Sequence, residues 1–151
     1  MIKIYKAPDD IENRDRTKKS IFLAGSIEMD KAINWQKVCE DNLSERYIIF
    51  NPRREFWDLS FKQSIDDLNF KQQVNWELNA LESADIIIMF FANDTISPIS
   101  LLELGLFAQS GKLNVIVESD FWRKGNIDIV CEKFNIKQYN SLEELISILN
   151  N

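Results

Sequence analysis

The chain has 151 residues, 45% hydrophobic and 11% aromatic, which is enough to form one domain, residues 1–151, around its own core. Its 18 basic and 24 acidic side chains give a net charge of −6, the opposite of the basic surface that holds a nucleic-acid backbone. There is no histidine, which excludes histidine-based triads and the commonest zinc sites. We therefore expect small-molecule ligands, no nucleic-acid polymer and no metal.

The cysteines and the N-terminal residues bear on where the protein acts. Cys39 and Cys131 form no C-x-x-C pair, and we interpret them as two small core residues in a reducing compartment. Residues 1–6 turn polar before any apolar signal region develops, and no run of about 18 apolar residues occurs. The sequence predicts a cytoplasmic protein with no membrane partner.

The first half of the chain predicts a short edge strand, two buried strands and two helices. Residues 2–5 form the edge strand, and a polar loop runs to residue 19. Residues 20–24 are a continuous apolar run closed by Gly25, typical of a strand buried on both faces, and a helix follows over 30–44. Another strand, 47–50, ends at Asn51 and Pro52 and leads to a helix that ends near Ser83.

The second half continues the alternation of strands and helices. Residues 85–91 form the clearest strand, after which Ser97, as a hydroxyl N-cap, and Pro98 open a helix that Gly111 closes. We then expect a strand at 114–117, a loop at 121–126, a short helix, a brief strand at 136–139 and a final helix. Ser141 and Glu144 form the capping box of that last helix.

This alternation predicts an α/β fold in three layers, with a parallel sheet and helices on both faces. In such sheets ligands bind outside the carboxyl ends of the strands, where the connections change direction. Four polar segments would meet there: residues 25–28, 51–54, 93–100 and 121–126.

Glu103 is the first candidate for chemistry, because it is the only charge in the apolar helix 97–111. An unpaired carboxylate there costs several kcal/mol, so the residue needs a partner or a purpose. The alternative is a capping box with Ser100, although the helix start at Ser97 would place Glu103 beyond the cap. Gly105, two residues later, favours a position of close approach and hence the functional interpretation.

Glu77 is the second candidate. Helical spacing puts it on one stripe with Val74 and Leu81, towards the apolar side of its helix. The alternative is a glutamate in the first turns that interacts with the helix dipole or reaches solvent. If Glu77 and Glu103 share one crevice, their pKa values are pushed apart.

Six segments in order resemble the nucleoside 2-deoxyribosyltransferase-like family: residues 20–27, 51–54, 74–77, 84–85, 97–105 and 121–126. The resemblance implies a flavodoxin-like fold with a five-stranded parallel sheet in the order 2-1-3-4-5. It implies that Glu103 attacks C1′ of a deoxyribose and forms a glycosyl ester, with Glu77 in the same pocket and Gly25 and Ser26 on its sugar side. It also implies that no cofactor is needed and that the chain forms a homo-oligomer.

Other loop residues are candidates for substrate binding. Asp94 is the one candidate for the base-reading aspartate of characterised relatives. Ser97 and Ser100 at a helix N-terminus could hold a phosphate, as in related deoxynucleotide N-glycosidases, although an ordinary cap explains them too. The basic residues facing them could be solvated loop charges, and the aromatic ones could be packing residues instead of base-stacking ones. The remaining candidates are Asn51, Arg53, Arg54, Trp57, Trp122, Arg123, Lys124 and Asn126.

The leading hypothesis is an enzyme that cleaves the N-glycosidic bond of a 2′-deoxynucleoside or deoxynucleotide and passes the sugar to another base or to water. The alternative is a non-catalytic module that binds a nucleotide or nucleotide-sugar with the same fold, because fold alone does not fix function.

Overall fold

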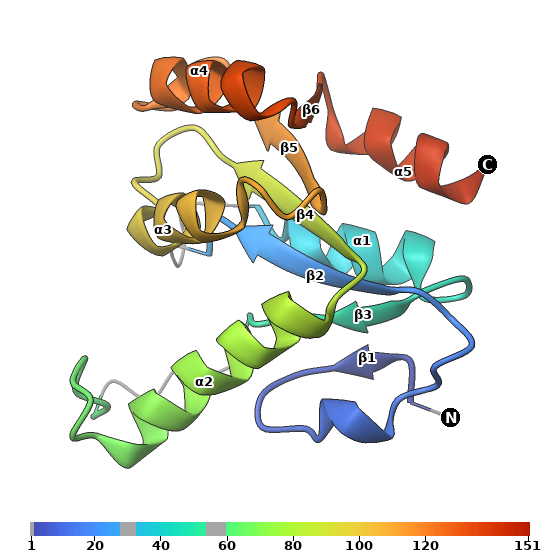
Figure 1. Cartoon of the computed structure of the whole chain (residues 1–151), viewed down its shortest axis with the longest axis vertical. Helices are drawn as coiled ribbons and strands as arrows, with labels where there is room; N and C mark the ends of the chain where they lie inside the picture. Colours follow the sequence, from blue (N-terminus) through green and yellow to red (C-terminus); the bar gives the residue numbers. More distant parts are fainter. Residues whose placement is uncertain (1, 28–32, 54–59) are drawn as a thin grey trace.

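The structure is a computed structural model that describes residues 2–27, 33–53 and 60–151. Its centre is a six-stranded parallel sheet in the order β1-β3-β2-β4-β5-β6 (Figure 1). The strands are β1 (Ile4–Tyr5), β2 (Ser20–Gly25), β3 (Ile48–Phe50), β4 (Ile86–Phe91), β5 (Leu113–Val117) and β6 (Lys137–Tyr139). The helices are the 3₁₀ turn η1 (Ile11–Asn13), α1 (Trp35–Leu43), α2 (Leu68–Ser83), α3 (Pro98–Phe107), α4 (Lys124–Phe134) and α5 (Leu142–Asn150).

The predicted fold class is confirmed, but the predicted number of five strands is wrong. The order β3-β2-β4-β5-β6 is the predicted 2-1-3-4-5 arrangement. The sixth strand is β1, which pairs in parallel with β3 and places Ile4 opposite Ile49. The predicted edge strand is thus part of the sheet, because the amides of Ile49 and Asn51 donate to the carbonyls of Lys3 and Tyr5.

Helices cover both faces of the sheet (Figure 1). Alternate side chains of β2 serve the two faces, with Phe22 in one core cluster and Leu23 in the other. The first cluster includes buried residues of α2, α3 and α4, and the second includes buried residues of α1 and α5. No helix in the described part of the chain has the length and apolar content needed to cross a membrane.

Several predicted boundaries move. The expected loop 121–126 is shorter, because α4 begins at Lys124, and that helix has 11 residues. Helix α1 begins at Trp35, and the predicted start at residue 30 lies outside the described residues. Helix α3 ends at Phe107, four residues before Gly111. The cap of α5 is confirmed, since the Ser141 side chain accepts from the Glu144 amide.

Gly25 allows β2 to approach β4 at the end of the sheet. Its φ is +141°, and a Cβ there would lie 2.3 Å from the carbonyl oxygen of Phe90. The next amide, of Ser26, donates to that same oxygen at 2.8 Å. Only glycine combines this backbone conformation with this contact, so Gly25 brings Ser26 to the carboxyl edge of the sheet.

We expect Gly25→Ala to lower the free energy of unfolding by at least about 2 kcal/mol, because the added methyl group meets backbone atoms. Gly105→Ala is the matched control, because a Cβ at Gly105 would meet no described atom within 4 Å and alanine is the better helix former. The close approach expected at Gly105 is therefore not found among the described residues. Gly105→Ala should raise the free energy of unfolding by about 0.5–1 kcal/mol. Urea unfolding measures both, and equal effects would contradict the role of Gly25.

Candidate active site

The candidate site lies at the carboxyl ends of β2 and β4, where the connections of the sheet change direction. From β2 the chain runs through α1 to β3 on one side, and from β4 it runs through α3 to β5 on the other. Such a switch point leaves a crevice between the two outgoing loops. Ser26, the loop 92–97 and the first turns of α3 lie at this edge of the sheet.

Glu103 lies in the second turn of α3. The helix starts with Ser97 as N-cap and Pro98 in its first position, so Glu103 is six residues past the cap. Its side chain is therefore beyond the free amides of the first turn, and the alternative of a capping box with Ser100 is wrong.

Two polar side chains of α3 are buried without a protein partner in the described part of the chain. Glu103 is 8% exposed and Ser100, one turn earlier, is 4% exposed, and neither side chain makes a hydrogen bond to a described group. In the described part of the chain, every side-chain nitrogen or oxygen that is fully enclosed has a hydrogen-bond partner. The oxygens of Glu103 and Ser100, one turn apart on α3, are therefore not fully enclosed by the protein.

The environment of Glu103 favours its neutral form. Burial and, as the smaller cause, the negative charge of Glu77 on α2 together raise the pKa of this carboxyl from 4.5 to about 8. Glu77 is half-buried, and Gln73 holds it through a hydrogen bond of 2.8 Å from Nε2 to Oε1. The two predicted carboxyl groups are thus near enough for the charge of Glu77 to affect the ionisation of Glu103.

Buried hydroxyls lie beside the carboxyl ends of β2 and β4. Ser26 Oγ lies 2.7 Å from Ser97 Oγ and 2.9 Å from Thr95 Oγ1. Ser97 has a left-handed backbone with φ of 49°, and its side chain does not cap α3, contrary to the expected hydroxyl cap. Thr95 was not predicted, because an isolated threonine in a polar loop carries no sequence signal.

A second polar network fixes the loop after β3. Asn51 Nδ2 donates to the buried Glu40 carboxylate at 2.7 Å, and its Oδ1 accepts from the Arg53 amide at 2.9 Å. The Arg53 guanidinium donates to Gln36 Oε1 at 3.1 Å. Gln36 and Glu40 were not predicted, since each is one polar residue among several on α1. Arg54 and Trp57, which were predicted, lie outside the described residues.

Comparison with known proteins agrees with this arrangement. The sequence profile described as "Nucleoside 2-deoxyribosyltransferase like" matches residues 18–121, more than half of the chain. The chain belongs to the nucleoside 2-deoxyribosyltransferase-like family. No functionally curated protein matches it. A crystal structure of a conserved protein from Enterococcus faecalis V583 shares the fold, with a TM-score of 0.59 and 12% identity over 88% of this chain and 98% of that one.

In this family member the loop after β4 is tied to the loop after β5. The Asn93 amide donates to the Glu118 carboxylate, and the Asp120 amide donates to Asn93 Oδ1, both at 2.9 Å. Trp122 Nε1 donates to the Ile96 carbonyl, also at 2.9 Å. These bonds hold the predicted residues of the two loops at one edge of the sheet.

The predicted residues of these loops differ in what they can offer a ligand. Trp122 is 54% exposed, with the Arg123 guanidinium 4.4 Å from its ring centroid. Lys124 is paired with Asp128 at 2.8 Å within α4. Asp94, with φ of 62°, and Asn126 are both exposed.

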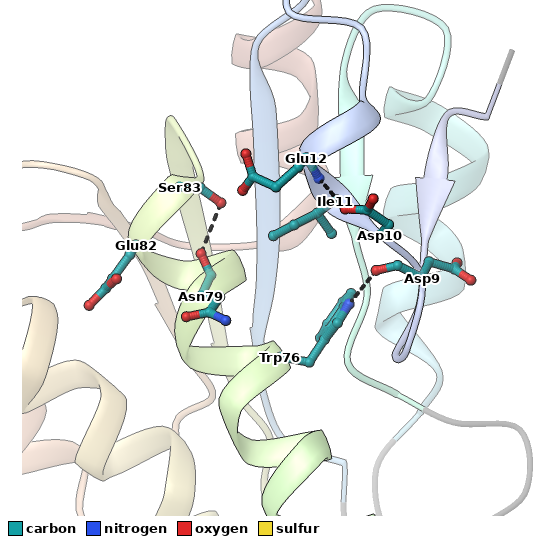
Figure 2. A pocket seen from close by; sticks show the side chains of 8 residues that line it. All are labelled: Asp9, Asp10, Ile11, Glu12, Trp76, Asn79, Glu82 and Ser83. Carbon is teal, nitrogen blue, oxygen red and sulfur yellow. Dashed lines mark hydrogen bonds between the residues drawn. The ribbon is translucent and has the colours of Figure 1, made fainter.

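A cavity of about 580 Å³ lies elsewhere, between the N-terminal segment and α2 (Figure 2). At this cavity Trp76 Nε1 of α2 donates a hydrogen bond of 2.9 Å to the Asp9 carbonyl of the N-terminal segment. None of its lining residues is basic and four are acidic, so a phosphorylated ligand would be repelled there. The lining residues are Asp9, Asp10, Ile11, Glu12, Trp76, Asn79, Glu82 and Ser83.

The raised pKa of Glu103 predicts that the free energy of unfolding depends on pH. Because the folded-state pKa lies above the unfolded value, the protonated carboxyl contributes stability that is fully present below about pH 4.5 and is lost as the pH rises towards about 8. Relative to wild type, Glu103→Gln should therefore gain roughly 1.4 kcal/mol per pH unit across this window.

Urea unfolding of both proteins across the window measures this gain. Glu132→Gln, at an exposed position of α4, is the control and should differ from wild type by a constant amount. A constant difference for Glu103→Gln as well would contradict the burial of its carboxyl.

Proposed function

We propose that this protein cleaves the N-glycosidic bond of a 2′-deoxynucleoside or deoxynucleotide through a covalent ester between Glu103 and the deoxyribose. The observation that carries the proposal is a carboxyl that is nine-tenths buried, is not fully enclosed and feels the negative charge of a second carboxylate, Glu77. Membership of the nucleoside 2-deoxyribosyltransferase-like family supports the choice of substrate.

The first step uses both carboxyl groups. At neutral pH the raised pKa leaves a proton on Glu103. Glu77 takes this proton and delivers it to the departing nitrogen of the base, which leaves Glu103 charged. As the bond from C1′ to nitrogen breaks, a Glu103 oxygen forms a bond to C1′. The absence of a 2′-hydroxyl makes the oxocarbenium-like transition state easier to reach.

The second step releases the sugar. A nitrogen of another base, or a water oxygen, attacks C1′, and the ester bond to Glu103 breaks. The proton lost by the acceptor returns to the carboxyl pair, which restores the starting state. Transfer and hydrolysis differ in the acceptor and in how well water is excluded, and they share the residues of both steps.

The substrate lies across the switch point in this proposal. Gly25 and Ser26 border the sugar, and Ser100 bonds to it or to its 5′ group. Arg53, already oriented by Gln36, serves an anionic group, and Trp122 stacks on the base. The other proposed binding residues are Asn51, Asp94, Ser97, Arg123, Lys124 and Asn126, with Arg54 and Trp57 from the segment outside the described residues.

Turnover assays test the reaction. Incubation with deoxynucleosides or deoxynucleotides, with and without a second free base, should give free or exchanged base by chromatography. Glu103→Gln should lower kcat/KM by at least about a thousandfold, whereas Glu132→Gln should leave it unchanged. If wild type turns nothing over and both it and Glu103→Gln bind a nucleotide equally, the protein is a binding module and the proposal fails.

We also propose that the protein acts as a homo-oligomer in the cytoplasm. The outer face of α3 exposes Ile99, Leu102 and Leu106 by 58–59% each, on the helix that carries Glu103. The described Pro98–Phe107 helix has no charge on this face, so a second copy would meet no like charge there. The buried thiols of Cys39 and Cys131 suit a reducing compartment.

Leu102→Glu should shift the oligomer towards monomer, because it places a charge in the proposed contact. Ile148→Glu is the control, since Ile148 is 50% exposed on α5, across the sheet. Sedimentation equilibrium of the three proteins measures the effect. A monomeric wild type, or dissociation by the control alone, would contradict this interface.

A further inference from the structure

Three buried hydroxyls join the end of β2 to the start of α3. Ser26 is 0% exposed, Thr95 3% and Ser97 5%, and each hydroxyl oxygen lies within 3.0 Å of the other two. Thr95 also donates to the Ala92 carbonyl at 2.8 Å, and the Ala92 amide donates to Ser26 at 2.9 Å. The cluster therefore connects the end of β2, the loop after β4 and the N-cap residue of α3.

This cluster holds α3 in place of an ordinary helix cap. Ser97 carries the left-handed φ of 49°, which costs a residue with a Cβ about 1 kcal/mol or more. Its hydroxyl bonds to Ser26 and Thr95 and not to the amides of the helix. The side-chain contacts of the cluster thus stabilise a backbone turn that fixes where the helix leaves the sheet.

The direction of α3 determines where the Glu103 carboxyl lies. Glu103 follows Ser97 by six residues within one continuous helix, so a change at the first turn displaces the carboxyl. A nucleophile loses much of its rate when it is displaced by about 1 Å from its reacting geometry. Thr95 itself is buried and makes its hydrogen bonds within the protein.

We propose that Thr95 is a positioning residue for Glu103, acting through the hydroxyl cluster that it forms with Ser26 and Ser97. The kinetic part of this inference rests on the proposed function. Its structural part does not, because the ionisation of Glu103 reports the position of the carboxyl whether or not a substrate is turned over.

The test compares Thr95→Val, which removes the hydroxyl and keeps the shape, with Thr95→Ser, which keeps the hydroxyl. Ser20→Ala is the matched control: it removes a fully buried hydroxyl, bonded to Asp85, from the opposite end of β2. Steady-state kinetics give kcat and KM, and ¹³C NMR titration gives the pKa of Glu103, with Glu103→Gln assigning its carboxyl signal.

Thr95→Val should lower kcat by at least about tenfold with a smaller change in KM, because it displaces the Glu103 carboxyl from its reacting position and leaves the substrate-binding groups in place. It should also move the pKa of Glu103 from about 8 towards 4.5, as the loosened helix lets water reach the carboxyl. Thr95→Ser should restore both, and Ser20→Ala should change neither. If Thr95→Val does not fold, Thr95→Ala takes its place, because it also lacks the hydroxyl.

Unchanged kcat and pKa in Thr95→Val, failure of Thr95→Ser to restore them, or an equal loss in Ser20→Ala would overturn the inference. If the wild type turns over no deoxynucleoside or deoxynucleotide but the pKa shift occurs in Thr95→Val alone, positioning stands and the proposed function fails.

Discussion

A carboxylic acid held inside an apolar helix is the constraint on which the site depends. Glu103 is the one charged residue in residues 97–111, and its burial disfavours the carboxylate form by several kcal/mol. Glu77, fixed by Gln73, adds a like charge and keeps the proton on Glu103 near neutral pH. In the proposed reaction Glu103 therefore starts as the neutral acid, releases its proton when a substrate binds, and becomes the negatively charged nucleophile.

The parallel sheet supplies the rigid frame around this pair. Gly25 lets β2 approach Phe90 closely, and Ser26 then meets Thr95 and Ser97 at the start of α3. Hydrogen bonds between the loops after β4 and β5 tie these loops together at the same edge of the sheet. Side chains on strands, helix starts and short tied loops keep their geometry better than side chains on long free loops. The switch point therefore combines a buried acid with fixed polar neighbours.

Much of the fold could be predicted because its signals are local. Continuous apolar runs at residues 20–24 and 85–91 indicate buried parallel strands, and the single charge at Glu103 marks its helix as unusual. The pairing of β1 depends on amides of β3 and of Asn51, which are distant in the sequence, so the sixth strand was not counted.

The finer parts of the site depend on tertiary contacts and could not be predicted. Ser97 has the sequence of an ordinary cap, but its hydroxyl turns to Ser26 and Thr95 because β2 ends beside it. Lys124 was placed in a loop, whereas it starts α4 and pairs with Asp128 one turn later. The roles of the site residues remain predictions.

Trapping the intermediate tests the central claim most directly. Wild-type protein mixed with a deoxynucleoside or deoxynucleotide, quenched in acid and examined by mass spectrometry should carry one deoxyribosyl group, located by peptide fragmentation on Glu103. Turnover without such an adduct, or an adduct on another residue, would contradict Glu103 as the nucleophile.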